Sequence, residues 1–241
     1  VAAGLGGTTH LSATQRMGYG WSKSFVRAIT YQDAADIYGK ADFHLIDTLF
    51  SAGALSALDP SILASERFIL VPPNFIAGLQ NAQPPTATQT NGILNDVAQQ
   101  TKVRATGALV ANGTDSPLVV PGISLHLNLR AAGLLQGNFQ ALQSVTIDAA
   151  RIAFVDKDLG SLEVGKLADL IAVRGNPLLD LKAAAEVALV IKNGNAFTQA
   201  QILAPFRTPP ALAARRASID AYQRYCREHE AQCDSAATHA H

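Results

Sequence analysis

Charged residues are scarce and evenly balanced in this chain. Only 16% of its 241 residues are charged, and 19 basic residues offset 19 acidic ones. A chain without net charge lacks the basic surface through which proteins bind nucleic acid or anionic membranes. No apolar run reaches the roughly 18 residues that a membrane-spanning helix requires. We therefore expect no nucleic-acid partner and no membrane span.

Cysteine is equally scarce, with only Cys226 and Cys233 present, and their spacing is not that of a metal-binding cysteine pair. In one continuous helix these residues lie roughly 10 Å apart, which exceeds the reach of a disulfide. A break near Glu230 would bring them together. Free thiols and a disulfide therefore both remain open.

The chain also lacks a recognisable signal peptide. Val1 opens directly into an apolar, glycine-rich stretch, whereas real termini are usually polar and poorly ordered. We expect the chain to begin inside a longer protein. Its compartment, exported or cytoplasmic, is left open.

The residues that are present fit a globular enzyme, since 48% are hydrophobic and 18 are glycine. Up to about residue 155, short apolar runs alternate with segments of helical periodicity. Strands are predicted at 7–13, 43–50 and 107–112, and helices at 31–40, 60–70, 91–103, 123–135 and 139–154. This alternation indicates parallel βα units.

The pattern changes after residue 155. Short strands are predicted at 168–173, 187–192 and 196–198, and Asn193-Gly194 is a strong hairpin signal between the last two. An amphipathic helix is predicted at 211–230. We divide the chain into an α/β part at 1–155, a β-rich part at 156–200 and a helical tail at 201–241.

Polar residues with possible chemical roles follow two of the predicted parallel strands. His10 ends the first strand, and Asp115 follows the apolar run GALVAN. Catalytic groups in α/β barrels lie at the carboxyl ends of strands, where a carboxylate can bind a metal or accept a proton. The alternatives are structural, because His10 could simply donate a hydrogen bond and Asp115 could cap the following loop.

Three further features carry weaker signals. His126 opens the helix after Asp115 and is a candidate for contact with substrate or metal ligands. His44 lies inside a strand and could face the core. Gly165-Lys166 lacks the upstream glycine and the following Ser/Thr of a phosphate-binding loop, so we expect only a turn leading to the strand at Ala168.

Longer motifs connect these residues to a known family. The segment GSLEVGKLADLIAVRGNPLLDL, followed by VIKNG, closely resembles the C-terminal signature of the amidohydrolase superfamily, in its imidazolonepropionase- and prolidase-like branch. Upstream, GTDSP resembles that family's eighth barrel strand, and GTTHLSATQRMGY resembles the sixth. The resemblance extends over roughly residues 7–198.

The resemblance implies a fold and an activity. The fold is α/β: a partial (β/α)8 barrel containing about strands six to eight, part of a small β-sandwich, and a C-terminal helix. The activity is hydrolysis of carbon–nitrogen bonds, in small-molecule or peptide-like substrates, by a water activated on one or two divalent metal ions, with zinc expected. Asp115 would bind metal and accept the proton of the water, and His10 would bind metal.

The chain also departs from the family pattern, and these departures matter as much as the matches. The His-x-His pair of the first strand, the bridging Lys or Glu of the fourth and the His of the fifth have no counterpart here. A complete barrel needs about 250 residues. The alternative is therefore a non-catalytic fragment or binding subunit, with the missing half on another chain or with a homo-oligomer covering its edges.

Two expectations follow for the structure. The side chains of His10 and Asp115 should lie on the same rim of one sheet, within about 10 Å, a distance that metal bonds of about 2 Å plus a water or substrate could bridge. The chain alone should be a poor folder, because strands missing from the barrel leave open sheet edges.

Overall fold

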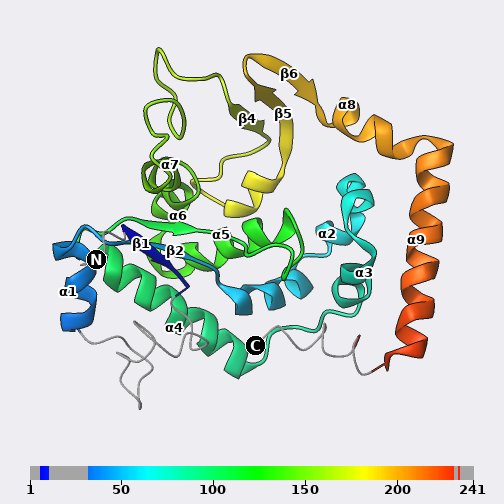
Figure 1. The fold of residues 1–241 in the computed structure, drawn as a ribbon, viewed down its shortest axis with the longest axis horizontal. Coiled ribbons are helices and arrows are strands. Elements are labelled where there is room, and N and C mark those ends of the chain that lie inside the picture. The colour runs from blue at the N-terminus through cyan, green and yellow to red at the C-terminus, as the bar shows by residue number, and fades with distance from the viewer. Residues whose placement is uncertain (1–5, 11–31, 231–232, 234–241) are drawn as a thin grey trace.

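A computed structural model describes residues 6–10, 32–230 and 233 of the chain. Residues 11–13 of the first predicted strand and the end of the helical tail lie outside this part. The described chain is a mixed α/β structure with helices and two small sheets (Figure 1). No helix in the described part is long and apolar enough to cross a membrane.

The first sheet is parallel, as the alternation of strands and helices predicts. It contains β1 (Gly7–Thr9), β2 (His44–Asp47) and β3 (Val110–Asn112), in the order β1-β2-β3. Both neighbouring pairs are parallel, with Thr9 opposite Ile46 and Asp47 opposite Asn112. The three carboxyl ends therefore lie along one rim.

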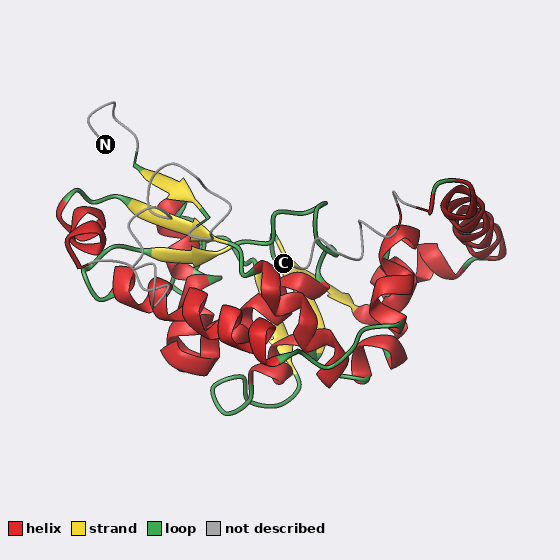
Figure 2. Cartoon of the chain, turned by 90° about the horizontal axis from the view of Figure 1, so that it is seen from below, coloured by secondary structure: helices red, strands yellow, loops and turns green. Residues whose placement is uncertain are grey.

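Helices lie beside this sheet, mainly on one side of it (Figure 2). They are α1 (Gln32–Lys40), α4 (Ala87–Arg104), α5 (Ile123–Gln136), α6 (Asn138–Ser144) and α7 (Ile147–Ile152). A capping box, in which Thr86 and Gln89 exchange side-chain-to-backbone bonds, starts α4 earlier than its apolar periodicity indicates. The single helix predicted at 139–154 is wrong, because the backbone leaves helical geometry at Thr146.

The segment after β2 also differs from its prediction. The strand predicted at 43–50 ends at Asp47, and η2 (Phe50–Leu58) follows. The single helix predicted at 60–70 is divided into α2 (Ser61–Ala64) and η3 (Glu66–Leu70), since Ser65 is extended and its side chain accepts a bond from Arg67 N. Pro72-Pro73 ends the preceding helix, as predicted, but it also begins a helix that was not predicted. This helix is α3 (Pro73–Gln80), with Pro73 as its first residue.

The second sheet is antiparallel and contains β4 (Leu170–Val173), β5 (Val187–Lys192) and β6 (Asn195–Thr198), with η4 (Leu181–Ala185) before β5. The predicted hairpin is confirmed, since Asn193 and Gly194 both have positive φ between β5 and β6. β4 begins later than Ala168. The Asp169 carboxylate instead accepts a bond from Asn193 N at 2.7 Å and so ties the hairpin turn to the start of β4.

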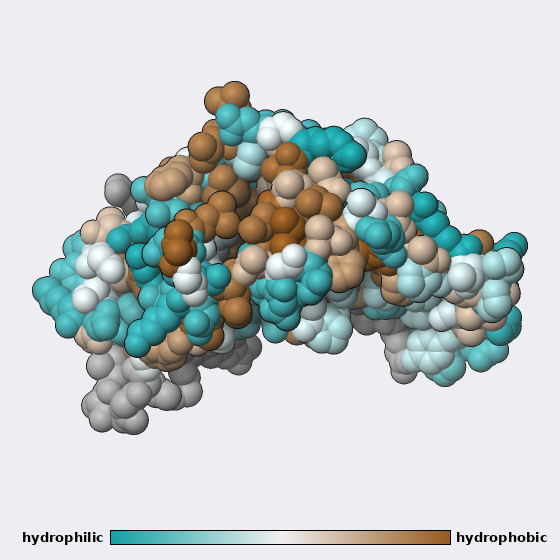
Figure 3. Space-filling view, turned by 90° about the horizontal axis from the view of Figure 1, so that it is seen from above, coloured by the Kyte–Doolittle hydropathy of each residue, from teal (hydrophilic) through white to brown (hydrophobic). Residues whose placement is uncertain are grey.

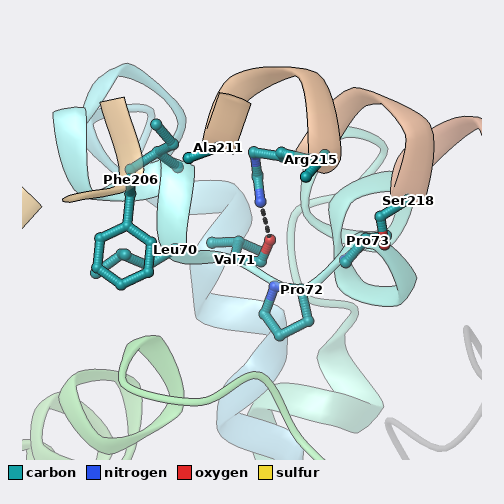
Figure 4. Close-up of a pocket in the computed structure, with 10 residues that line it drawn as sticks. Leu70, Val71, Pro72, Pro73, Phe206, Ala211, Arg215 and Ser218 are labelled. Atoms are coloured by element: carbon teal, nitrogen blue, oxygen red, sulfur yellow. Dashed lines mark hydrogen bonds between the residues drawn. The ribbon is translucent and has the colours of Figure 1, made fainter. Parts of the chain in front are cut away.

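The C-terminal part forms α8 (Gln199–Leu203), η5 (Ala204–Arg207) and α9 (Pro209–Glu228), and α9 lies at the edge of the molecule beside α3 (Figure 1). Arg215 anchors α9, donating from Nη1 to Val71 O at 2.8 Å (Figure 4) and from Nη2 to Phe68 O at 3.1 Å. The open question about the cysteines is answered: Cys226 and Cys233 form a disulfide, because α9 ends at Glu228 and the backbone bends at His229.

Candidate functional site

His10 and Asp115 come together at the carboxyl rim of the parallel sheet. His10 follows β1 and Asp115 follows β3, and the His10 Nε2 atom lies 3.6 Å from Asp115 Oδ2. The predicted proximity is confirmed. Their side chains are 21% and 36% exposed, so solvent reaches both groups while the sheet supports them.

Both residues adopt a backbone conformation that non-glycine residues rarely occupy. The φ angle is 62° at His10 and 52° at Asp115. Such left-handed residues cost about 1–3 kcal/mol each and persist where surrounding bonds hold them. His10 N donates to Ile46 O at 2.9 Å, and Gly113 N, just before Asp115, donates to Asp47 O at 2.7 Å. The end of β2 therefore holds both loops in place.

The His10 imidazole packs against Phe50, with ring centroids 5.3 Å apart. Its Nδ1 atom is buried and has no hydrogen-bond partner in the described part of the chain. One ring nitrogen thus faces Asp115, while the other is a buried polar atom without a protein partner. Buried polar atoms in folded proteins usually have a hydrogen-bond partner, so this atom calls for an explanation.

The donor set fits a divalent metal in kind but not in number. Imidazole nitrogen and carboxylate oxygen are both ligands of zinc. A zinc site needs about three or four protein ligands. No group of three or more His, Cys, Asp or Glu side chains within the described residues is arranged to hold a metal ion. The remaining ligands would therefore have to come from outside this part of the chain.

A family model described as the amidohydrolase family matches residues 100–197, which include Asp115 and the whole antiparallel sheet. Over these residues the chain is similar to the amidohydrolase family. A crystal structure of a prolidase complexed with N-methylphosphonate-L-proline matches at 19% identity and a TM-score of 0.53. Another, titled as an amidohydrolase, matches at 18% identity and a TM-score of 0.52.

Each of these two matches covers 82% of this chain but only 41% of the solved structure. The chain thus spans about two fifths of the length of the amidohydrolase structures that it resembles. No curated protein matches the chain. At these identities the likeness establishes the fold, and the activity of a whole amidohydrolase remains a matter for proposal.

His126 lies near the start of α5. Burial, together with the nearby guanidinium groups of Arg67 and Arg130, lowers the pKa of His126 to about 4. The ring is therefore neutral at pH 7. Its Nδ1 atom is buried without a partner among the described residues, so its role as a contact to substrate or to metal ligands stays a prediction.

His44 and Lys166 have structural surroundings. His44 begins β2, at the end of the sheet opposite His10, and its Nδ1 accepts a bond from Leu109 N at 3.3 Å. Lys166 Nζ lies 2.5 Å from Ser161 Oγ and 3.2 Å from Glu163 Oε1. The expected turn is observed, and the Lys166 ammonium group is engaged by its own loop.

A buried polar network behind the rim has no counterpart in the sequence prediction. Gln100 Nε2 on α4 donates to Asp47 Oδ2 at 2.9 Å and to Asn112 Oδ1 at 3.0 Å. Gln136 donates to Gln100 Oε1 at 2.9 Å, and Asn112 donates to Ser144 Oγ at 2.7 Å. All five side chains are at most 8% exposed. The available signal was Asp47, a polar residue at a strand end like His10 and Asp115.

A groove of the described structure lies away from this rim, beside α9 (Figure 4). It is an apolar hollow of about 320 Å³ between η3, the start of α3 and α9 (Figure 4). Leu70, Pro72, Phe206 and Arg215 are among the residues that line it. Neither His10 nor Asp115 contributes to it, so the groove is not the candidate active site.

Proposed function

We propose that this chain is part of a metal-dependent hydrolase that cleaves carbon–nitrogen bonds. The observation that carries the proposal is the approach of His10 Nε2 to Asp115 Oδ2, 3.6 Å apart at the rim of a parallel sheet, in a chain similar to the amidohydrolase family. In this proposal β1, β2 and β3 are the sixth to eighth strands of a (β/α)8 barrel. β4 to β6 form part of a small β-sandwich, and the boundaries stay at 1–155, 156–200 and 201–241.

His10 and Asp115 would hold the metal, with the other ligands supplied from outside the described residues. A bound divalent ion, zinc in this proposal and one or two in number, lowers the pKa of a water ligand to about 7. Asp115 accepts the proton of the attacking water and returns it to the leaving nitrogen. Its carboxylate suits this task because it is partly exposed and His10 faces one of its oxygens.

The proposed substrates are peptide-like amides or cyclic amides. Support for a peptide-like substrate comes from the solved prolidase with its phosphonate–proline ligand, which this chain resembles in fold. His126 would contact the substrate or a metal ligand as a neutral imidazole, since its pKa of about 4 leaves it uncharged at pH 7. A neutral ring can both donate and accept a hydrogen bond.

The test uses the complete protein with single substitutions at the rim. Asp115→Asn keeps the shape of the side chain but cannot accept the proton, so kcat against an Xaa-Pro dipeptide panel should fall about 10²–10⁴-fold. His10→Asn should lower both metal content and activity. His44→Asn is the matched control, because His44 lies at the other end of the sheet. Unchanged kcat in Asp115→Asn would disprove the assignment.

A second candidate is a non-catalytic fragment or binding subunit. It is favoured by the absence of any group of three metal-ligating side chains among the described residues. Metal analysis separates the two candidates. The hydrolase should retain zinc after dialysis and lose it in His10→Asn, whereas a binding subunit should hold no stoichiometric metal in either form.

A further inference from the structure

One buried amide side chain joins two of the strand ends that form the rim. Gln100 on α4 is fully buried, and its Nε2 atom donates to Asp47 Oδ2 at 2.9 Å and to Asn112 Oδ1 at 3.0 Å. Asp47 ends β2 and Asn112 ends β3, and the two residues lie opposite each other in the parallel register. Because the two hydrogens of an amide group can each serve one acceptor, Gln100 sets the distance between these strand ends.

The same strand ends carry the main-chain bond that shapes the Asp115 loop. Gly113 directly follows Asn112, and its N–H group donates to Asp47 O at 2.7 Å. Asp115 comes two residues later with a φ of 52°, a conformation that persists only where the surrounding structure holds it. A shift of Asn112 relative to Asp47 would therefore reach Asp115 through Gly113 and change its distance from His10.

The bridge is itself anchored in the packed interior. Gln136 Nε2 on α5 donates to Gln100 Oε1 at 2.9 Å, and Asn112 Nδ2 donates to Ser144 Oγ on α6 at 2.7 Å. The other carboxylate oxygen of Asp47 accepts a bond from the main-chain N–H of the next residue at 3.0 Å. Each member is thus oriented by further partners, and such networks rigidify the groups that they connect.

We infer that Gln100 is a positioning residue of the candidate site. Its amide fixes the spacing of the β2 and β3 ends and thereby the approach of Asp115 to His10. The catalytic consequence rests on the proposed hydrolase function, in which a displacement of about 1 Å can cost about 100-fold in rate. The placement of the rim does not rest on that function, and it can be measured in the 241-residue chain.

Amide hydrogen exchange measures this placement without any use of activity. Gly113 N–H donates to Asp47 O at the carboxyl end of β2, and Leu45 N–H donates to Leu109 O at 3.0 Å nearer the start of β2. Gln100→Met keeps the length of the side chain and removes both donated bonds. Exchange at Gly113 should accelerate about tenfold relative to Leu45, because the rim opens locally. Equal acceleration at both amides would mean a general loss of stability and would overturn the inference.

Two further variants separate the bridge from a general defect. Asn112→Ala removes only the acceptor on β3 and keeps the bond between Gln100 and Asp47, so it should raise the same ratio of exchange rates even if Gln100→Met does not fold. The double variant should raise the ratio no further than the larger single effect, since both changes cut one bridge. Thr101→Val is the matched control, because Thr101 Oγ1 donates to Val97 O within α4 at 2.8 Å. An unchanged ratio in Asn112→Ala, or fully additive effects, would contradict the inference.

In the complete hydrolase, kcat and KM should respond differently. Gln100→Met should lower kcat against the Xaa-Pro dipeptide panel about 10–100-fold. KM should stay unchanged, because a displaced proton acceptor weakens binding of the transition state and not of the substrate. Thr101→Val should leave both constants unchanged. A normal kcat in Gln100→Met would overturn the positioning role. A wild-type protein without hydrolysis would instead refute the proposed function, and the exchange ratio would still decide whether Gln100 places the rim.

Discussion

The two sheets of this protein differ in how completely they are covered. All three residues of β3 in the parallel sheet are buried, whereas all four residues of β6 in the antiparallel sheet are exposed. Helices α4 to α7 all contact β3, while β6 is contacted chiefly by β5 and α8. The parallel sheet is therefore held by a packed interior, and the antiparallel sheet by its strand pairing and its turn.

The covered sheet also carries the polar groups whose burial is costly. Arg104 and Asp148 form an ion pair of 2.6 Å behind β3, with Asp148 only 3% exposed. In the antiparallel sheet the corresponding pair, Lys192 with Asp169, lies at the surface, where the lysine side chain is 62% exposed. The comparison teaches that substitutions of similar chemistry should have very different consequences in the two regions.

The largest expected effect is the loss of the buried ion pair. Arg104→Met leaves the Asp148 carboxylate buried and removes the bond to Val110 O, so the free energy of unfolding should fall by about 3–5 kcal/mol. Lys192→Met should leave the urea midpoint unchanged, because water screens that pair. Equal midpoint shifts in the two variants would show that burial does not distinguish the regions.

The amide network should give the next largest effect. Gln100→Ala removes three hydrogen bonds and leaves Asp47 and Asn112 without their Gln100 donor, at a cost of about 3 kcal/mol. Gln223→Ala, on the exposed face of α9, is the control and should change stability by less than about 0.5 kcal/mol. Urea denaturation measures both, and a stable Gln100→Ala variant would show that water replaces the amide.

Stability should also depend on pH through His126. Its pKa is lowered to about 4 by burial and by Arg67 and Arg130, so between pH 6.5 and 4 the unfolded chain binds the proton more readily. This contribution is fully present above pH 6.5 and is lost as pH falls towards 4, in total about 1–3 kcal/mol. His126→Gln should flatten the profile over that range, whereas His229→Gln, at an exposed histidine, should not.

Substitution of exposed apolar residues around β4 should have the smallest effect on stability. It should nevertheless clearly reduce association between chains. Apolar residues gather on the face seen in Figure 3. In the loops around β4, Phe154, Leu162, Val164 and Leu179 are at least 81% exposed. We expect the isolated chain to associate through these residues and its open sheet edges. The pair Val164→Asp and Leu179→Asp should reduce the apparent size in gel filtration without lowering the melting temperature.

That prediction also tests the expectation that the chain is incomplete by itself. A wild-type chain that runs as a monomer, unfolds in one transition and binds stoichiometric zinc would contradict it. Such a result would mean that residues outside the described part supply the missing ligands and cover the edges.

The order of the elements could be read from the sequence, whereas several boundaries could not. The Asn193-Gly194 hairpin was predictable because only a few residues adopt positive φ at two successive positions. The broken helices at Ser65 and Thr146 were not, because apolar periodicity continues through both positions and neither break carries a Gly or Pro. Helix α3 was missed because proline ends one helix and starts the next with equal ease.

The candidate site shows the same division. The sequence by itself identified His10 and Asp115 as candidate site residues, since each lies at the end of a predicted strand. Only the tertiary structure decided that they lie 3.6 Å apart, across 105 positions of sequence, because parallel pairing through β2 aligns the two carboxyl ends. It alone also revealed that Gln100 joins Asp47 to Asn112, and that a bend at His229 closes the Cys226–Cys233 disulfide. The spacing of residues along the chain predicts which side chains are neighbours within one helix or strand. Contacts between residues far apart in the sequence depend instead on how these elements pack, which residue patterns alone do not specify.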